Sequence, residues 1–392
     1  MKNTLELTDN YKIKKSLAII VRLFIFNFFF KKLIEKLIEK YMNKNKSQIS
    51  SESSRYIQLT KFQTVLRGPS SNVAVLAIIL FIITLLATWL YPNSFNFYTP
   101  GNLAVLSQHI PIIVIMSIGV GTLMICGEFD LSIAGVYTLC PFITASALNE
   151  MGWHLFPSVL IGFVVALVIG FANGFVTTRL KVPSFIASLG MMFFLKGVVR
   201  GFSENPETGV PGSISLSPPE WFFNIMAGQI FGSFYAQTLW CIFFAILAYL
   251  FLNLHTFGNH VFATGGDKDA AEKDGINTSK TKIIAFMICS FCAAFAGLTS
   301  STRVNLISPG QTFSGLELQA IAACVIGGVY LFGGRGTVLG IVLGACLFGI
   351  VGNLLVIIRA PGEYTSVFMG FIIIFLVILN NKLGLAKNKK DL

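Results

Sequence analysis

Apolar residues are gathered along the chain into long runs that short polar stretches separate. A helix that crosses the hydrocarbon core of a bilayer needs about 20 mostly apolar residues. Ten runs of about that length predict an all-α, polytopic membrane bundle of about ten transmembrane helices. The runs cover residues 73–91, 103–126, 129–149, 155–178, 183–200, 237–257, 281–301, 316–332, 337–357 and 364–380.

The composition agrees with a chain that is mostly enclosed in lipid. Of the 392 residues, 54% are hydrophobic and 12% are charged, whereas a soluble domain carries about 25% charged residues. So few charged residues are not enough to cover the surface of a water-soluble protein of this length. The composition therefore favours an integral membrane protein, with membrane lipid as its surroundings.

The net charge of +11 is unevenly distributed along the chain. Lysines gather in residues 1–65 and again near the C-terminus, on both sides of the apolar runs. Basic flanks of transmembrane helices remain on the cytoplasmic side. We therefore expect a multi-pass protein of the cytoplasmic (inner) membrane with both termini in the cytoplasm, and no nucleic-acid partner.

Three regions follow from this pattern. Residues 1–65 form a basic cytoplasmic region in which "LIEKLIEK" has helical spacing and a charged face, as in an interfacial amphipathic helix. An additional span through "SLAIIVRLFIFNFFF" is the alternative. Residues 66–385 form the transmembrane domain, and residues 386–392 form a basic cytoplasmic tail.

Two of the apolar runs resemble each other. "VLIGFVVALVIGFANGFV" (residues 159–176) is similar to "VLGIVLGACLFGIVGNLL" (residues 338–355). The two copies lie five crossings apart, so their helices run in opposite directions. An inverted internal repeat is typical of transporters, in which the pathway lies between the repeats.

Three acids lie close to the apolar runs. Glu128 and Asp130 belong to "GEFDLS", and Glu317 follows a break at Pro309, Gly310 and Gly315. A carboxylate at bilayer depth is costly, so it should face a cavity, a partner or the bundle interior. Asp130, with Ser132 beside it, suits a helix start, because an N-cap accepts a hydrogen bond from free backbone N–H groups. For Glu128 the sequence leaves open a pathway, a pair with an arginine, or the aqueous edge.

Catalytic motifs are missing from the sequence. No GxxxxGK[ST] loop is present to hold ATP phosphates, and no HExxH or GxSxG motif indicates a metalloprotease or a hydrolase. The "CSFC" stretch, from Cys289 to Cys292, lies inside a predicted span, so we interpret it as packing. We expect no catalytic residue, no metal site and no cofactor on this chain.

The loop "FATGGDKDAAEKDGINTSKTK" (residues 262–282) is the longest charged stretch between predicted spans. "GGD" suits the start of a short helix and "DGIN" its end, while Asp269 and Lys273 are spaced for an ion pair. We interpret this helix as a docking site for a cytoplasmic partner. A solvated loop is the alternative.

Four stretches together resemble one family. "GEFDLSIAG", "FATGGDKDAAEKDGIN", "LELQAIAACVIGG" and "LFGGRGTVLGIVLGACLFGIVGNLL" are similar to the permease subunits of sugar ABC importers of the ribose/xylose/galactose type. The resemblance implies an ATP-driven importer without enzymatic chemistry on this chain, in which ATP and Mg bind a separate cytoplasmic ATP-binding subunit. It also implies an extracytoplasmic sugar-binding protein and a second permease copy, in a homodimer or a heterodimer.

The resemblance also implies roles for particular residues. It places the ATPase-docking coupling helix at Gly266, Asp269, Ala270, Ala271 and Gly275, so Ala271→Asp is expected to abolish coupling. It places Glu128, Asp130, Ser132 and Glu317 at the translocation pathway or helix break.

Two departures affect the identity of the sugar, because Glu128 and Gln319 replace a glycine and an acid found in many members. A different class of protein also remains open. An ion-coupled secondary transporter would use Glu128, Asp130 and Glu317 to carry protons or Na⁺.

Overall fold

The computed structural model describes residues 69–91, 95–203, 212–310 and 315–359, with residues 367, 370, 371 and 374. The interfacial helix predicted within residues 1–65, the tail 386–392 and most of the predicted span 364–380 lie outside the described residues, so those predictions stay untested. The chain divides into a unit of residues 1–96 with 352–370 and a unit of residues 97–351 with 371–392.

The first unit contains one complete described helix, α3 (Pro69–Leu90). Its sequence "VAVLAIILFIITLLATWL" carries no charged residue. The helix is long and apolar enough to cross a membrane, as the run at residues 73–91 predicted.

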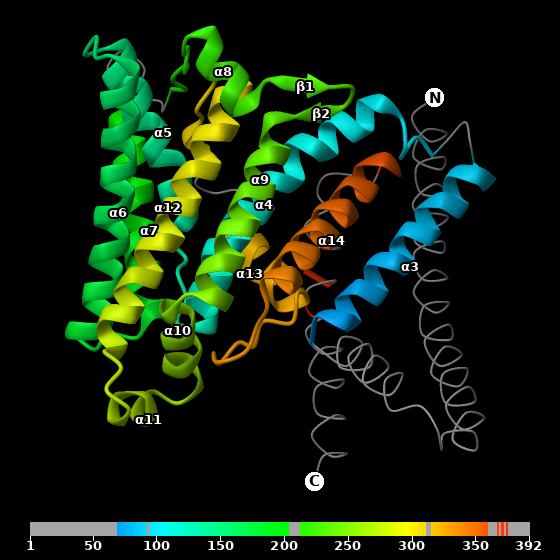
Figure 1. The fold of residues 1–392 in the computed structure, drawn as a ribbon. Coiled ribbons are helices and arrows are strands. Elements are labelled where there is room, and N and C mark those ends of the chain that lie inside the picture. Colours follow the sequence, from blue (N-terminus) through cyan, green and yellow to red (C-terminus); the bar gives the residue numbers. More distant parts are fainter. Residues whose placement is uncertain are drawn as a thin grey trace, which may run out of the picture. The chain divides into compact units, whose positions relative to one another are not determined.

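The second unit is built from helices of membrane-spanning character (Figure 1). Across the described residues of both units, seven helices are long and apolar enough to span, and two shorter apolar helices, α5 and α13, accompany them. This confirms the all-α polytopic bundle. The helices of the second unit are α4 (Pro100–Ile125), α5 (Ile133–Asn149), α6 (Leu155–Arg179), α7 (Ser184–Ser203), α9 (Ala236–Tyr249) with the π-helical turn η1 (Leu250–Leu254), α12 (Thr278–Val304), α13 (Leu316–Ile326) and the start of α14 (Val338–Ile357).

The helix α13 is shorter than the sequence predicted. The run at residues 316–332 suggested a full span, but α13 ends at Ile326 and spans only about 16 Å at 1.5 Å per residue. Gly327 closes the helix and Gly328 takes a positive φ of 83°, so the backbone turns there. The apolar residues after Gly328 therefore lie beyond the helix.

Short elements mark the two ends of the second unit (Figure 1). The hairpin end carries α8 (Glu220–Ala227) and the antiparallel strands β1 (Gln229–Phe231) and β2 (Phe234–Tyr235), with Phe231 opposite Phe234. The coupling end, on the opposite side, carries α10 (Thr256–Gly266) and α11 (Lys268–Lys273). We call these two sides of the bundle the hairpin end and the coupling end.

The helix α12 lies at the centre of the unit, and glycines allow the neighbouring helices to approach it unusually closely. A Cβ on Gly119 of α4 would lie 2.9 Å from the Cβ of Cys292, and one on Gly170 of α6 would lie 2.7 Å from the Phe286 carbonyl. Such small residues allow membrane helices to pack backbone against backbone. Cys289 and Cys292 are free and buried in this packing, which agrees with the interpretation of "CSFC".

The directions of α6 and α14 agree with the inverted repeat. Gly170 and Gly174 of α6 lie against Phe286 and Ile283 of α12, so these two helices are antiparallel. On the other side, Gly121 of α4 lies against Ile341 and Gly349 against Ile110, so α4 and α14 are also antiparallel. Gln108 and Gly119 of α4 lie against Arg303 and Cys292 of α12, so these two helices are antiparallel as well. It follows that α6 and α14 run in opposite directions.

The close packing around α12 predicts that Gly297 does not tolerate even the addition of one methyl group. A Cβ on Gly297 would collide with the Tyr137 carbonyl oxygen of α5, so we expect Gly297→Ala to lower the free energy of unfolding by about 1–3 kcal/mol. Gly190→Ala on α7 is the control, because its Cβ would meet nothing within 4 Å. Thermal unfolding of the purified protein in detergent measures both. An unchanged Gly297→Ala variant would contradict the close approach of α5 to α12.

Candidate translocation and coupling site

The break that the sequence places around "GEFDLS" is a regular helix end. α4 ends at Ile125, Gly127 follows its C-cap residue at a φ of 87°, and the Gly127 and Glu128 N–H groups donate to the Met124 and Leu123 carbonyls at 2.9 and 3.2 Å. This is the Schellman pattern, which satisfies the last carbonyls of a helix and favours glycine at the left-handed position. The loop 126–132 then leads into α5.

Asp130 is fully buried at the start of α5 and is held by a small polar network. Its Oδ1 accepts hydrogen bonds from the backbone N–H and the hydroxyl of Ser132 at 2.8 and 2.6 Å. The Asn173 amide of α6 donates to the Ser132 hydroxyl at 2.9 Å and contacts both Asp130 oxygens at 3.4 Å. The carboxylate therefore fixes the turn that begins α5, as a capping group does, although it binds Ser132 itself rather than a later N–H.

The network lies inside the bundle rather than at its edge. Asn173 is flanked by Gly170 and Gly174, which pack against Phe286 and Ile283 of α12. These two residues of α12 lie five and eight positions beyond Thr278, or about 8 to 12 Å along the helix. The break thus starts at the coupling end with Gly127 and reaches about a quarter of the length of α12 with Asp130.

Glu128 forms an ion pair with Lys282 of α12. The side chains are only 12% and 14% exposed, so this pair is largely shielded from water. Of the possibilities that the sequence left open for Glu128, pairing with a cation is the one observed, with a lysine in place of the expected arginine. Removing one partner of a shielded ion pair strongly destabilises the folded protein, because the other charge then stays buried without a counter-charge.

The short helix predicted in the charged loop is present as α11, and its role in docking a partner stays a prediction. Asp267 caps it by accepting the Ala270 N–H at 3.0 Å, and Gly275, with a φ of 84°, follows its end. The ion pair on α11 joins Lys268 and Glu272 at 3.7 Å, and the predicted pair of Asp269 with Lys273 does not occur among the described contacts. The predicted ion pair was therefore wrong: the observed pair lies one residue earlier along the helix.

The residues predicted for the coupling helix fall on different sides of it. Asp269 and Ala270 are exposed, Gly266 is the last residue of α10, and Ala271 is only 3% exposed. Ala271 therefore faces the protein, and the expectation that Ala271→Asp tests docking is corrected: that change would bury a charge. Ala270 is the alanine that a docking partner can reach.

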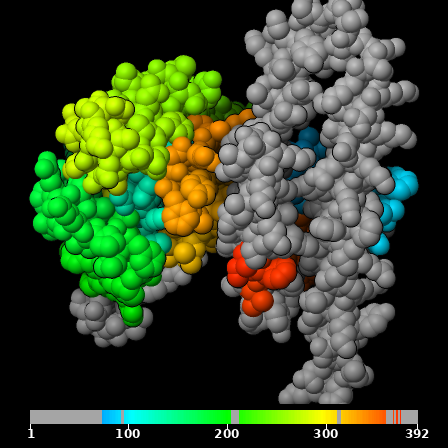
Figure 2. Space-filling model, turned by 90° about the horizontal axis from the view of Figure 1, so that it is seen from below, coloured from blue at the N-terminus to red at the C-terminus, as the bar shows by residue number. Residues whose placement is uncertain are grey.

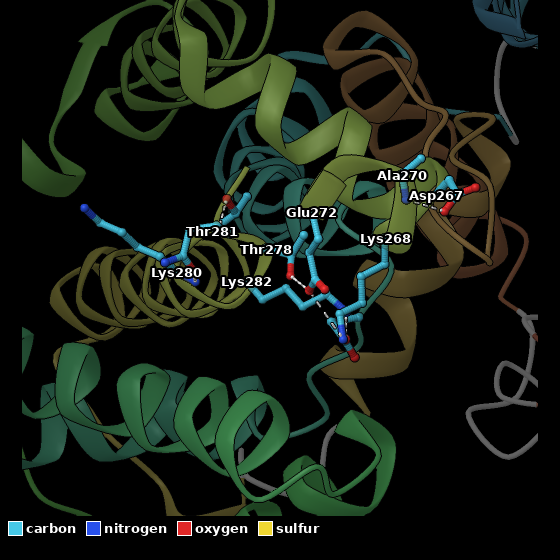
Figure 3. A network of polar contacts seen from close by, with 10 residues as sticks. Asp267, Lys268, Ala270, Glu272, Thr278, Lys280, Thr281 and Lys282 are labelled. Atoms are coloured by element: carbon cyan, nitrogen blue, oxygen red, sulfur yellow. Dashed lines mark hydrogen bonds and ion pairs between the residues drawn. The ribbon is translucent and has the colours of Figure 1, made fainter. Parts of the chain in front are cut away.

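The docking helix is tied to the first turn of α12. The Glu272 carboxylate accepts a hydrogen bond from the Thr278 hydroxyl at 2.5 Å, and Asn277 caps α12 by accepting the Lys280 N–H at 2.9 Å (Figure 3). Lys282, the partner of Glu128, lies one turn further along α12. A continuous series of contacts therefore leads from α11 to the loop that holds Glu128.

A second connection runs through four glycines, which we call the glycine junction: Gly127, Gly265, Gly333 and Gly334. The Gly334 N–H donates to the Ile125 carbonyl at 2.8 Å. A Cβ on Gly265 would collide with that same carbonyl, and one on Gly333 would lie 2.8 Å from the Gly127 Cα. The end of α4, the end of α10 and the "GGRG" turn therefore pack backbone against backbone, with no space for side chains.

The glycine junction lies at the coupling end, and its member Gly265 precedes the first residue of α11 by only three positions. Figure 2 shows the yellow-green region of α10 and α11 beside the orange region of the "GGRG" turn. Gly333 and Gly334 take positive φ values of 87° and 75°, which only glycine adopts without strain. The end of α10, which leads directly into α11, is therefore packed on the end of α4 without side chains between them.

Glu317 lies near the middle of the bundle, away from the other acids. It belongs to the first turn of α13, after Gly315 at a φ of 72°, and is 7% exposed. The Ser117 hydroxyl of α4 contacts the Ala320 carbonyl at 3.4 Å, which places Glu317 about halfway along α4. Its Oε2 has no hydrogen-bond partner within the part of the chain that the structure describes.

The structure separates the four predicted pathway residues into three environments. Asp130 and Ser132 share one network, Glu128 is paired with Lys282, and Glu317 stands apart from them. Sequence reasoning missed Asn173 and Lys282. An asparagine inside the apolar run 159–176 was the available signal for Asn173, because a buried amide needs a partner.

A bundle of apolar helices that are interrupted within the membrane region, with a short charged helix at one end, is typical of membrane transport proteins. The chain belongs to the permease family described as "Branched-chain amino acid transport system / permease component", whose model matches residues 102–377. With the sequence motifs above, this makes the chain a permease subunit of the sugar ABC importer type.

Curated relatives cover most of this chain. The "Autoinducer 2 import system permease protein LsrC" of Photorhabdus luminescens is 32% identical over 281 residues, which are 71% of this chain and 81% of the relative. The protein of the same name from Yersinia pseudotuberculosis serotype O:3 (strain YPIII) is 31% identical over 294 residues, 74% of this chain and 80% of the relative. No solved structure matches the chain.

The ion pair between Glu128 and Lys282 predicts a specific pattern of stability. Glu128→Gln and Lys282→Gln should each lower the thermal unfolding temperature, because each leaves one shielded charge without its partner. The double variant should lose less than the sum of the two, with a coupling energy of about 0.5–3 kcal/mol. Unfolding of the four proteins in detergent measures this cycle, and strictly additive losses would show that the pair does not form.

Proposed function

We propose that this chain forms the membrane pathway of an ATP-driven importer for a small polyhydroxylated compound. The candidates are simple sugars such as ribose, xylose or galactose, and the compound named in its relatives, autoinducer 2. ATP hydrolysis takes place on a separate cytoplasmic subunit that docks on α11. The observation that carries the proposal is that α11 presents exposed charges outward and is joined inward to the break between α4 and α5.

The mechanism follows from those contacts. Closure of the ATPase moves α11, and the movement reaches α12 through Glu272 and Thr278 and reaches α4 through the glycine junction. The pair of Glu128 with Lys282 holds the loop 126–132 to α12. Because closely packed elements shift as bodies rather than deform, the two repeats rock against each other and open the pathway alternately to each side.

The coupling end is then the cytoplasmic side. The loop at this end carries Lys268, Lys273 and Lys280, as expected for a cytoplasmic loop. The hairpin end, with α8, β1 and β2, faces the extracytoplasmic binding protein. The second permease copy completes the membrane core, as the family resemblance implies.

A secondary transporter remains the second candidate, and one observation favours it. Glu317 is a buried acid with an oxygen that has no partner among the described residues, which suits a group that exchanges protons. Glu128 and Asp130 count against this candidate, because a lysine and a hydrogen-bond network already hold them.

Reconstitution into liposomes separates the two candidates. We expect no uptake of ribose or autoinducer 2 by the chain alone, under either a proton or a Na⁺ gradient, because the chain has no means to use ATP. Addition of the ATPase and the binding protein should restore uptake that depends on ATP. Gradient-driven uptake by the chain alone would instead establish the secondary transporter.

The docking surface is tested with Ala270→Asp. A carboxylate at this exposed position of α11 should repel or displace the ATPase, so we expect co-purification of the ATPase and uptake to fall at least about tenfold, as for a hot-spot contact. Lys280→Ala is the control, because it changes the charge equally and its side chain points away from the contacts in Figure 3. Equal uptake by Ala270→Asp and the wild type would show that docking occurs elsewhere.

A further inference from the structure

Eight described residues carry a buried side-chain polar atom without a hydrogen-bond partner, and five of the eight lie between the hairpin end and the middle of the bundle, the other three being Thr177, Thr264 and Ser290. Among the described residues, no hydrogen bond reaches either amide atom of Gln237, which is fully buried, or the side-chain atoms Ser301 Oγ, Thr302 Oγ1, Arg303 Nε and Glu317 Oε2. Buried polar groups in native proteins almost always have a partner, and each unpaired group costs about 1–3 kcal/mol. A concentration of them therefore calls for a ligand that can supply the missing bonds.

Two of these residues, Arg303 and Gln237, lie at the same level along α4. Arg303, in the last turn of α12, donates through Nη1 to the Gln108 side-chain oxygen at 3.1 Å. Thr238, next to Gln237 at the start of α9, donates to the Ser107 carbonyl at 3.1 Å. Because Ser107 and Gln108 are neighbours in α4, the starts of α4 and α9 and the end of α12 come together at the hairpin end.

Gln237 is directed toward α12 by the aromatic residues on the same face of α9. The rings of Trp240 and Phe244 lie 4.9 and 4.8 Å from the ring of Phe295. Gln237 precedes Trp240 by three residues, so it lies on the same helix face. Thr302 follows Phe295 by seven residues, about two turns, and therefore continues the facing surface of α12 toward Gln237.

Glu317 lies deeper on the same side of α4. It is one turn before Ala320, which lies beside Ser117, and Ser117 is nine residues beyond Gln108. At 1.5 Å per residue this places Glu317 about 9 Å further into the bundle than Gln108. The unpaired groups thus extend from the hairpin end toward the middle of the membrane, on the side away from the docking helix.

We propose that Gln237, Thr302, Arg303 and Glu317 form a transit site for a neutral polyhydroxylated ligand. The amide and the threonine hydroxyl both donate and accept, the guanidinium donates and the carboxylate accepts, which matches hydroxyl groups. The charges of Arg303 and Glu317 cancel, so the site has no net charge to retain an ion. The inference rests on the proposed function and identifies where the substrate is held after it leaves the binding protein.

An aliphatic amino acid fits these residues less well. Its carboxylate and ammonium groups could pair with Arg303 and Glu317, but its branched side chain needs apolar contact and would leave the buried polar groups of Gln237 and Thr302 without partners. The hydroxyls of a sugar can instead satisfy the whole series of groups. A measurement of leucine uptake therefore distinguishes an amino acid from a sugar as the ligand.

The test compares two threonines that differ only in place. Thr302 and Thr177 both carry a buried hydroxyl without a partner among the described residues, but Thr177 lies on α6 near the coupling end. In the complete complex with ATPase and binding protein, Thr302→Val should raise the KM for ribose or autoinducer 2 about threefold, as for one lost neutral hydrogen bond. Thr177→Val should stay within about twofold of wild type, and Gln237→Leu should raise the KM about tenfold.

Each result decides a separate question. If the wild-type complex shows no ATP-dependent uptake of ribose, xylose, galactose or autoinducer 2, the proposed function fails. If it does, and Thr302→Val and Thr177→Val transport equally well, the transit site is wrong while the function stands. Saturable uptake of leucine that Thr302→Val and Gln237→Leu leave unchanged also overturns the site. If Gln237→Leu does not assemble with the ATPase, the two threonine variants alone decide.

Discussion

The structure depends on one constraint: a helix that stops inside a membrane protein must find partners for its last carbonyls and for any charge beside it. Lipid offers none, so such a break is tolerated only where protein encloses it. α4 meets the constraint with Gly127, which turns the chain back onto Leu123 and Met124. Asn173 of α6 and Lys282 of α12 then satisfy the acids that follow. Four helices must therefore meet around one loop, and α12 becomes the centre of the bundle.

The same constraint brings the end of α10, next to α11, against the break. Gly265, Gly333 and Gly334 let the ends of α4 and α10 and the "GGRG" turn approach without side chains between them. Side chains would provide freedom to adjust, whereas backbone packed on backbone transmits a displacement directly. The hydrogen bond between Thr278 and Glu272 and the ion pair between Lys282 and Glu128 form a second connection between α11 and the break. Two routes of different physical character thus join α11 to the start of α5.

Much of this architecture could be predicted from the sequence, because lipid imposes a length and a composition on every span. The runs at 103–126 and 155–178 match α4 and α6 to within a few residues. The short length of α13 was not predictable from hydropathy, because a positive φ at Gly328 ends the helix while the apolar residues continue. The pairing of Glu128 with Lys282 joins residues 154 positions apart, so only the folded bundle reveals it.

The buried face of α11 could not be read from the sequence for a similar reason. A six-residue helix has too few apolar positions to show which side is covered, and both Ala270 and Ala271 fit either face. The tertiary packing of α11 against α10 and α12 covers Ala271 and leaves Ala270 exposed. Residues on such short elements are therefore assigned to a surface only after the neighbouring helices are placed.

The acids of the two repeats differ in a way that bears on how transport is driven. Ion coupling needs acids that release and bind a cation during each cycle, and an acid held by permanent partners resists that exchange. Asp130 is held by Ser132 and Asn173, and Glu128 by Lys282, so both brace the first repeat. Glu317, in the second repeat, is the acid whose Oε2 is left without a partner among the described residues. One such group can form a weak contact with a polar molecule, whereas the acids of the first repeat are already occupied by partners within the bundle and suit a structural role.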